Sequence, residues 1–321
     1  MERKMNFFEK LANAAQQNNS LLCVGLDPDL TMIPEQDVVF LNSLIIEATA
    51  DLVCAYKPNL AIYEAMGREG LSALDKTLDM IRKTNLNTPI IGDGKRGDIG
   101  PCSFAYAKML FEKYNFDAVT VNPYMGSDSI TPFLDSRNKG VFILCRTSNP
   151  GGKDIQELMV MREGDSIARP LYEIVAELAL SWNRNGNVGL VVGATYPEQI
   201  ARIRQICPNM LFLIPGVGAQ GGSTEKTVRS AVNAEGGGFI IHVSRKIMHA
   251  AKTSTGKLRT RVEAKKEMRR VAHQIRDEIN SYLPTPLKET QKKVHNGNGD
   301  KARRGDSRQE ESTPAVAISG V

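Results

Sequence analysis

Short runs of apolar residues recur along the chain, separated by longer stretches with helical spacing. The apolar runs cover residues 21–26, 54–56, 89–91, 118–121, 140–145, 188–192, 211–214 and 238–243. Most of these runs are continuous rather than alternating, which is typical of strands buried on both faces of a parallel sheet. The stretches between them predict helices over residues 39–53, 66–84, 103–115, 127–138, 169–185, 197–206, 223–235 and 258–283.

This alternation of strand and helix, repeated eight times, predicts an α/β protein with the (β/α)8 TIM-barrel fold. An amphipathic segment at roughly residues 5–17 predicts one helix before the first strand. A doubly wound open sheet is the alternative. That fold usually needs fewer strands, and the turn at residues 25–29 lacks the glycine-rich G-x-G-x-x-G pattern that begins it.

The end of the chain differs from the body in composition. Residues 284–321 mix Lys, Asn, Gly, Asp, Arg, Ser and Glu, with almost no apolar content before Val316. Such a segment cannot offset its ordering entropy by burying apolar surface, so we expect it to be disordered. The barrel domain is therefore predicted to span residues 1–283.

Composition narrows the class of protein. The chain has 321 residues, of which 41% are hydrophobic and 24% charged, as in an ordinary globular protein. It holds no run of 18 apolar residues that would predict a transmembrane helix, and residues 1–10 do not resemble a signal peptide. The five cysteines lack metal-ligand or redox-motif spacing. These features predict a cytoplasmic protein without membrane partners.

The net charge of +5 is concentrated in residues 245–270, where ten basic residues face only Glu263 and Glu267. One interpretation is a nucleic-acid or polyphosphate surface. The favoured interpretation is the solvated face of the last helix, because no aromatic residue interleaves the charges for base stacking. The apolar stripe of this helix is predicted to comprise Leu258, Val262, Val271, Ile275 and Ile279.

The most informative chemistry lies at residues 92–99, Gly-Asp-Gly-Lys-Arg-Gly-Asp-Ile, directly after an apolar run. Asp93 and Lys95 are two positions apart, and on a strand this spacing points both side chains to one face. A lysine between Asp93 and Asp98 at the end of a buried strand costs desolvation, which favours a functional role. A salt-bridged surface turn is the alternative, since Asp-Gly-Lys also suits turns.

Other polar residues also follow predicted strands, at the end of the barrel where TIM-barrel active sites lie. These residues are Asp27, Lys57, Asn59, Asn122, Thr147, Ser148, Asn149, Gln220, Ser244 and Arg245. The glycine-rich segment at residues 215–219, together with Arg245, matches a barrel phosphate site made of backbone N–H groups and a guanidinium. The residues alone thus predict an enzyme for a phosphorylated small molecule.

Several motifs together resemble the orotidine 5′-phosphate decarboxylase family, in its bacterial subgroup of longer chains. The motifs occur in order at residues 25–28, 56–59, 93–99, 121–124, 146–150 and 215–217, within a resemblance that runs from about residue 20 to 250. The most specific element is Lys57 with Asp93-x-Lys95-x-x-Asp98. The resemblance implies decarboxylation of orotidine 5′-phosphate to UMP, with no metal and no organic cofactor.

The resemblance also implies roles for the catalytic residues. Lys95 stabilises the C6 carbanion and protonates it, while Asp93 lies near the departing carboxylate. Lys57 and Asp98 keep the charges in order and contact the ribose hydroxyls. Asp98 is expected to come from the neighbouring subunit, which makes the working unit a homodimer with composite active sites.

The same resemblance assigns the substrate-binding residues. Asp27 matches the ribose-binding aspartate, and Thr147, with Ser148, matches the hydroxyl position that reads the pyrimidine edge. Gln220 and Arg245 match the phosphate grip, with the Ser244 N–H as support.

Two other function classes remain open at this stage. Related sugar-phosphate barrels keep an Asp-x-Lys-x-x-Asp strand but use metal-assisted enediolate chemistry, which needs a magnesium site with oxygen ligands. A basic nucleic-acid-binding module acting through residues 245–270 ranks below both enzymes.

Overall fold

The computed structural model of the chain describes residues 5–218, 220–284 and 287, and within them eight parallel strands form one sheet in the order β2-β1-β10-β9-β8-β5-β4-β3. The strands are β1 (Leu22–Leu26), β2 (Ala55–Pro58), β3 (Ile91–Arg96), β4 (Ala118–Val121), β5 (Gly140–Arg146), β8 (Val188–Val192), β9 (Leu211–Pro215) and β10 (Phe239–Val243). Parallel bridges from Tyr56 to Ile90 and from Asn59 to Asp93 join β2 to β3. The sheet is therefore a barrel, as predicted.

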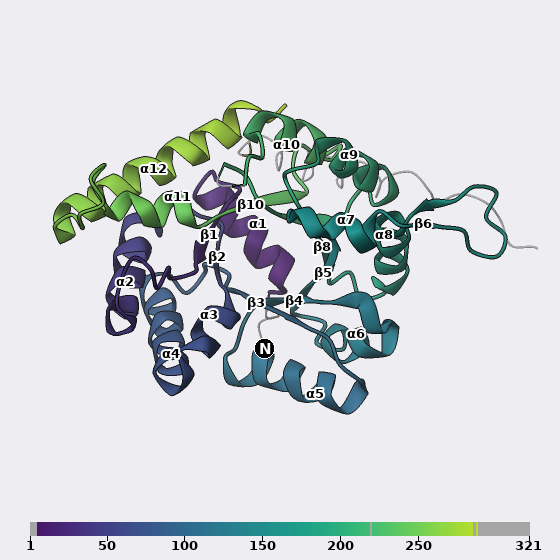
Figure 1. Cartoon of the computed structure of the whole chain (residues 1–321), viewed down its shortest axis with the longest axis horizontal. Helices are drawn as coiled ribbons and strands as arrows, with labels where there is room; N and C mark the ends of the chain where they lie inside the picture. Colours follow the sequence, from purple (N-terminus) through teal and green to yellow (C-terminus); the bar gives the residue numbers. More distant parts are fainter. Residues whose placement is uncertain (1–4, 219, 285–286, 288–321) are drawn as a thin grey trace, which may run out of the picture.

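The helices lie outside this ring of strands (Figure 1). They are α2 (Val38–Thr49), α3 (Leu60–Ala65), α4 (Gly67–Thr84), α5 (Gly100–Lys108), α6 (Ser127–Leu134), α8 (Leu171–Trp182), α9 (Pro197–Ile206), α10 (Thr224–Ala231), α11 (Arg245–Met248) and α12 (Arg261–Ser281). The eight helices predicted from spacing are confirmed with shifts of a few residues at their ends, and the one predicted over 103–115 is α5 continued by a π-helical segment, Met109–Lys113. The short helices α3 and α11 have no counterpart in the prediction, because one or two turns carry too little periodicity to detect.

A longer excursion follows β5. It contains a short helix, α7 (Lys153–Gln156), and an antiparallel hairpin formed by β6 (Met159–Val160) and β7 (Arg169–Pro170). The hairpin projects from the body of the molecule (Figure 1). The apolar run at 140–145 and the helix predicted over 169–185 leave a long connection here, but two-residue strands leave no apolar pattern that would predict the hairpin.

The predicted N-terminal helix is present as α1 (Phe7–Gln17) and lies across one end of the barrel (Figure 1). Its first turn is fixed by a capping box in which Asn6 and Glu9 each bond the other's backbone N–H, at 3.0 and 2.9 Å. Phe7 packs edge-on against Phe142 of β5, with ring centroids 5.8 Å apart. Helix α1 therefore closes the amino end of the barrel and leaves the carboxyl end for a site.

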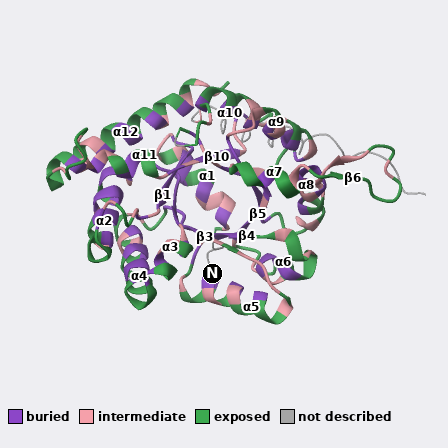
Figure 2. Ribbon diagram, in the orientation of Figure 1, coloured by how far each residue is buried: buried purple, intermediate pink, exposed green. Residues whose placement is uncertain are grey.

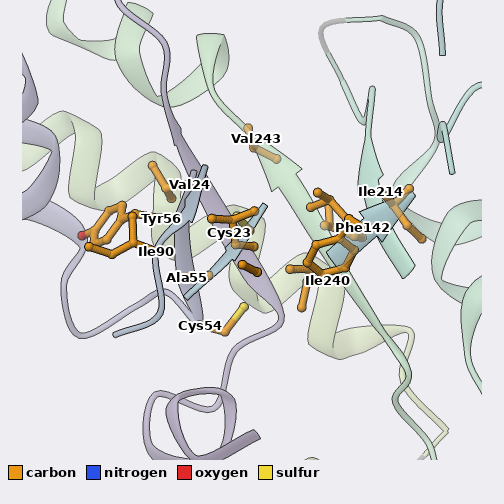
Figure 3. Packing of buried hydrophobic residues seen from close by; sticks show 14 of the residues in the cluster. Cys23, Val24, Cys54, Ala55, Tyr56, Ile90, Phe142, Ile214, Ile240 and Val243 are labelled. Carbon is orange, nitrogen blue, oxygen red and sulfur yellow. The ribbon is translucent and has the colours of Figure 1, made fainter. Parts of the chain in front are cut away.

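The strands carry the buried core, whereas the outer faces of the helices are largely exposed (Figure 2). Figure 3 shows part of this core, in which Val24, Ile240 and Phe142 belong to one continuous cluster of buried side chains. Burial of β1, β4 and β8 at every position explains why their sequences are continuously apolar rather than alternating.

Helix α12 corrects part of the prediction for the basic segment. Val271, Ile275 and Ile279 are buried as expected, but Leu258 and Val262 are exposed, at 49% and 78%. Leu258 precedes the helix, and the helix turns Val262 outward, with Ala264 and Met268 on the buried stripe instead.

Three basic side chains of α12 have acidic partners on neighbouring α2 and the turn after it. Arg261 and Lys265 lie 2.7 and 3.3 Å from carboxylate oxygens of Glu47, and Arg269 lies 2.6 Å from Asp51. These contacts fit the interpretation of this segment as an outward helix face.

Two predictions fall on residues outside the described ranges. The expected disordered tail, residues 284–321, lies outside them except for Pro284 and Leu287. Ala219, in the glycine-rich segment after β9, also lies outside them. Among the described helices, none combines the length and apolar character needed to cross a membrane.

Candidate active site

A cavity of about 900 Å³ opens at the carboxyl end of the barrel. Of the ten site residues predicted from the sequence, nine line this cavity: Asp27, Lys57, Asp93, Lys95, Thr147, Ser148, Gln220, Ser244 and Arg245. Asp98 is not among the lining residues. The parallel barrel explains the convergence, because its strands all end at the same rim.

The centre of the site is a carboxylate held between two ammonium groups. Lys57, from the end of β2, donates a hydrogen bond to Asp93 Oδ2, and Lys95 Nζ donates to Asp93 Oδ1 at 2.6 Å. Thr120 of β4 adds a third hydrogen bond from its hydroxyl to Asp93 Oδ1 at 2.8 Å. Together these hydrogen bonds fix the orientation of Asp93 and hold both lysine ammonium groups against its carboxylate.

The backbone around Lys95 departs from a regular strand. The β3–β4 register shifts between Gly92 and Arg96, and Lys95 has φ of +47°, in the left-handed region. Asp93 and Lys95 are expected to meet because alternate strand residues share a face, but regular pleating stops before Lys95, so alternation is not the reason. Their side chains still meet, because the Lys95 N–H donates to Thr120 Oγ1 at 2.9 Å and holds the irregular turn in place.

Electrostatics keep the array charged despite burial. Burial acts to raise the pKa of Asp93, but the ammonium groups of Lys57 and Lys95 outweigh it and hold that pKa well below its usual range. Burial likewise acts to lower the pKa of Lys57, and the carboxylates of Asp93 and Asp27 together raise it above the ordinary value. Lys57 is 4% exposed and Lys95 is 46% exposed, so Lys95 is the ammonium that reaches into the cavity.

Asp27 follows β1, the strand paired with β2, and lines the cavity on the side of Lys57. Burial raises its pKa above the ordinary value, against the opposing charge of Lys57. Its Oδ1 is buried without a hydrogen-bond partner in the described part of the chain. The carboxylate is thus available to a ligand.

The wall after β5 is held by a fully buried arginine. Arg146 donates to the backbone oxygen of Thr147 at 2.9 Å and to Glu157 Oε1 at 2.7 Å, while its guanidinium lies 4.0 Å from the ring centroid of Tyr196. Gln156 bonds both the backbone N–H and the hydroxyl of Thr147, each at 2.9 Å. These contacts set the position of Thr147 and anchor the start of the long excursion after β5.

A third wall is formed by the segments after β9 and β10. Gly216 has φ of +102°, and a Cβ there would lie 2.8 Å from Gln220 Oε1, so only glycine allows Gln220 to approach this closely. Arg245 follows Ser244 directly after β10, and its side chain is exposed at the cavity rim. An exposed guanidinium beside a glycine-rich turn suits a ligand anion.

Asp98 lies beyond the end of β3, away from the cavity of its own chain. Its backbone exchanges hydrogen bonds with Ser103 Oγ, at 3.1 and 2.9 Å, and its Oδ1 accepts from the N–H of Ile99 at 2.7 Å. These contacts fix the turn into α5 and leave the carboxylate outside the group formed by Lys57, Asp93 and Lys95.

Thr120 and His242 line the cavity although the sequence did not single them out as site residues. Thr120 bonds both Asp93 and Lys95, but a threonine inside a β-branched apolar strand gives no signal of chemistry. His242 of β10 also lines the cavity, although its place inside an apolar run suggests packing in the core. Asn122 follows β4 as expected but is not among the lining residues. Its side chain instead caps a short helix by accepting from the Tyr124 N–H.

Metal-ligating side chains do not cluster in the described part of the chain. Within the described ranges, no three His, Cys, Asp or Glu side chains are grouped as ligands for an ion. The five cysteines are unpaired, and all but Cys102 are buried.

Comparisons with known proteins give a consistent result. The sequence profile described as "Orotidine 5'-phosphate decarboxylase / HUMPS family" matches residues 20–257. An orotidine 5′-phosphate decarboxylase of Roseiflexus castenholzii is 46% identical over 286 residues, which cover 87% of this chain and 99% of the relative. A protein of the same name from Cupriavidus metallidurans is 47% identical over 285 residues, with 87% and 99% covered.

A solved structure supports the same relationship. The structure of Leishmania donovani OMP decarboxylase superposes with a TM-score of 0.74 at 40% identity. The match covers 87% of this chain and 98% of that chain.

Proposed function

The chain belongs to the orotidine 5′-phosphate decarboxylase / HUMPS family, and we propose that its barrel cavity decarboxylates orotidine 5′-phosphate to UMP, a step of pyrimidine biosynthesis, through the Lys57–Asp93–Lys95 array. The observation that carries this assignment of residues is the ionised Asp93, buried between two ammonium groups at the base of the cavity. Such an array is costly to build and has no evident structural purpose at the open end of a barrel.

The reaction requires electrostatic help at one carbon. The bond between C6 of the pyrimidine and the carboxylate carbon breaks, its electron pair stays on C6, and CO2 leaves. The resulting carbanion has no adjacent π system to delocalise the charge, so a fixed cation beside C6 is the effective device. Lys95 Nζ then transfers one proton to C6, which gives UMP, and the lysine recovers its proton from solvent.

The hydrogen bonds around Asp93 hold the ammonium groups in place before the substrate arrives. Lys95 is bound to Asp93 through its side chain and to Thr120 through its backbone, so little reorganisation is needed in the transition state. Asp93 also places a negative charge near the substrate carboxylate. The repulsion between the two carboxylates ends when CO2 departs as a neutral molecule, which favours the product side of the step.

The other walls bind the rest of the substrate. Asp27 binds the ribose, Thr147 and Ser148 read the pyrimidine edge, and Gln220 and Arg245, with the Ser244 N–H, hold the phosphate. The cavity supports this arrangement because these groups lie on its separate walls around the lysine array. Binding energy from the remote phosphate can then hold the pyrimidine against Lys95.

The working unit is a homodimer in which Asp98 completes the partner's cavity. The position of Asp98 outside its own cavity supports this proposal. Exposed apolar side chains also flank it, with Ile99 at 56%, Phe104 at 62% and Tyr124 at 81% exposure. Exposed apolar side chains beside an incomplete site are what a subunit interface requires. A cytoplasmic location fits a chain whose five cysteines are all unpaired, four of them buried.

The alternative functions are less favoured. Metal-assisted enediolate chemistry would need the carboxylates as ion ligands, yet Asp93 already binds two lysines, and the relatives compared bear the decarboxylase name. A nucleic-acid surface on α12 would need free cations, whereas Arg261, Lys265 and Arg269 pair with Glu47 and Asp51.

One assay tests the function directly. The purified chain is incubated with orotidine 5′-phosphate in EDTA, and loss of the substrate's pyrimidine absorbance and formation of UMP are followed. Turnover in EDTA that is absent from a Lys95→Ala variant supports the proposal. Turnover that appears only after Mg²⁺ is restored would favour the enediolate class, and steeply salt-dependent nucleic-acid binding without turnover would favour the basic module.

A further inference from the structure

A histidine faces the aspartate of the ribose wall across a small gap. His242 Nε2 lies 3.7 Å from Asp27 Oδ2, and the two side chains are only 10% and 16% exposed. The gap exists because Gly25 has no side chain: a Cβ there would lie 2.5 Å from His242 Nε2 and 2.9 Å from Asp27 Oδ2. Gly25 also pairs with Lys57 in the sheet, so this gap adjoins the lysine array.

Polar atoms at this gap are buried without a geometrically satisfied hydrogen-bond partner in the described part of the chain. Within the described ranges, Asp27 Oδ1, His242 Nε2 and Ser244 Oγ are all buried and unpaired. Buried polar groups in folded proteins are nearly always hydrogen-bonded, so three unpaired atoms on one cavity wall indicate a position built for a ligand. A histidine that served only packing in the core would have its ring nitrogen hydrogen-bonded within the protein.

We propose that His242 determines specificity for the substrate's sugar, because its Nε2–H and the Asp27 carboxylate together hold one ribose hydroxyl. The inference rests on the proposed function. At 3.7 Å the two side chains are too far apart for a direct hydrogen bond, but one oxygen fits about 2.8 Å from both. A hydroxyl donates to the carboxylate and accepts from the imidazole, which neither a methylene nor an ammonium group can do.

The charges around His242 support its role as a neutral donor. The carboxyl group of Asp27 lies 3.7 Å from it, and the charges of Asp93, Lys57 and Lys95 act on it as well. Burial and the ammonium of Lys57 lower the pKa of His242 well below its usual value, against the opposing effect of Asp93. The ring therefore carries one N–H, and the proton is assigned to Nε2 because the Asp27 carboxylate faces that nitrogen.

The experiment compares substrates that differ by one hydroxyl. Values of kcat and KM are measured for orotidine 5′-phosphate and for its 2′-deoxy and 3′-deoxy analogues. The variants are His242→Asn, which keeps a donor, and His242→Leu, which has nearly the same size without one. His273→Asn is the control, because His273 forms a similar histidine–aspartate pair with Asp277, at 2.8 Å, on the outer helix α12.

We expect the wild type to reject one deoxy analogue by a factor of about 100 or more in kcat/KM, because a site built for a hydroxyl is left unpaired without it. His242→Leu should lower kcat/KM for the full substrate about 10-fold, mainly through KM, and leave the rejected analogue nearly unchanged. His242→Asn should recover part of the selectivity. The His273 variant should match the wild type.

Two results overturn the inference. Equal losses on ribose and deoxyribose substrates in His242→Leu would mean that the histidine only supports the fold. If that variant does not fold, calorimetric binding of UMP and its deoxy analogues to the wild type decides, and equal affinities reject the proposal. A wild-type protein that binds UMP selectively but never turns over orotidine 5′-phosphate would instead contradict the proposed function.

Discussion

Lys95 reaches Asp93 from a left-handed backbone position, with its Nζ 2.6 Å from Asp93 Oδ1. The side chain is tied at one end by this ion pair and at the other by the hydrogen bond of its N–H to Thr120. Because both ends are fixed, the ammonium enters the reaction already oriented, as electrostatic stabilisation of a carbanion requires.

Lys95→Ala should abolish turnover while leaving a folded protein, since Lys95 acts mainly on charge that develops during the reaction. We expect kcat/KM to fall about 100-fold or more, with a smaller loss of UMP affinity measured by calorimetry. A variant that retained a tenth of the wild-type kcat/KM, a loss of only about 1.4 kcal/mol, would contradict the assigned role.

Thr120→Val should lower kcat about 10-fold with little change in KM, because it removes one hydrogen bond to Asp93 and one acceptor for the Lys95 N–H. Valine matches threonine in shape, so packing in β4 is preserved. Thr120→Ser is the control, because serine keeps the hydroxyl and should retain most of the activity. If valine and serine behave alike in steady-state kinetics, Thr120 acts through packing alone.

Arg245→Ala should raise KM for orotidine 5′-phosphate about 10- to 100-fold, through the loss of charge-assisted hydrogen bonds to the phosphate. The unphosphorylated nucleoside should be affected little. Free phosphite added to the nucleoside should increase turnover by the wild type more than by the variant. Equal loss on both substrates would show that Arg245 is structural.

Arg204→Met should destabilise the barrel without changing the active site. The Arg204 guanidinium donates to the backbone oxygens of Ala231, Met210 and Gly238, at 2.8, 2.6 and 2.7 Å, and stacks on Phe212. These carbonyls lie near the amino ends of β9 and β10, opposite the cavity. Leaving them unpaired should cost about 3 kcal/mol, seen as a lower Tm, while KM stays constant.

Lys95→Ala and Asp98→Ala chains, each inactive alone, should regain activity when their subunits exchange. If Asp98 serves the partner's cavity, a mixed dimer has one site with both defects and one with neither, so about half of the wild-type activity per dimer returns. Mass spectrometry verifies exchange. Exchange without activity would place both residues in one chain's cavity, against the shared site but not against the decarboxylase reaction.

The sequence alone determined the barrel and most of its site. Strands such as β4 and β8 are buried at every position, so their apolar runs are continuous and readable without coordinates. In a barrel all strands end at one rim, so polar residues such as Lys57, Asp93 and Arg245 could be placed together from their positions after strands. The apolar pattern and the barrel topology are sufficient to place these residues at one rim.

Only the tertiary structure decided how these side chains meet. The irregular end of β3 places Lys95 by a left-handed φ rather than by strand alternation, and no local pattern predicts that angle at a lysine. Thr120 and His242 lie inside apolar strands, where their neighbours along the chain suggest packing. Their partners, Asp93 and Asp27, come from other strands, and contacts across a barrel depend on register and shear that the sequence of one strand does not carry.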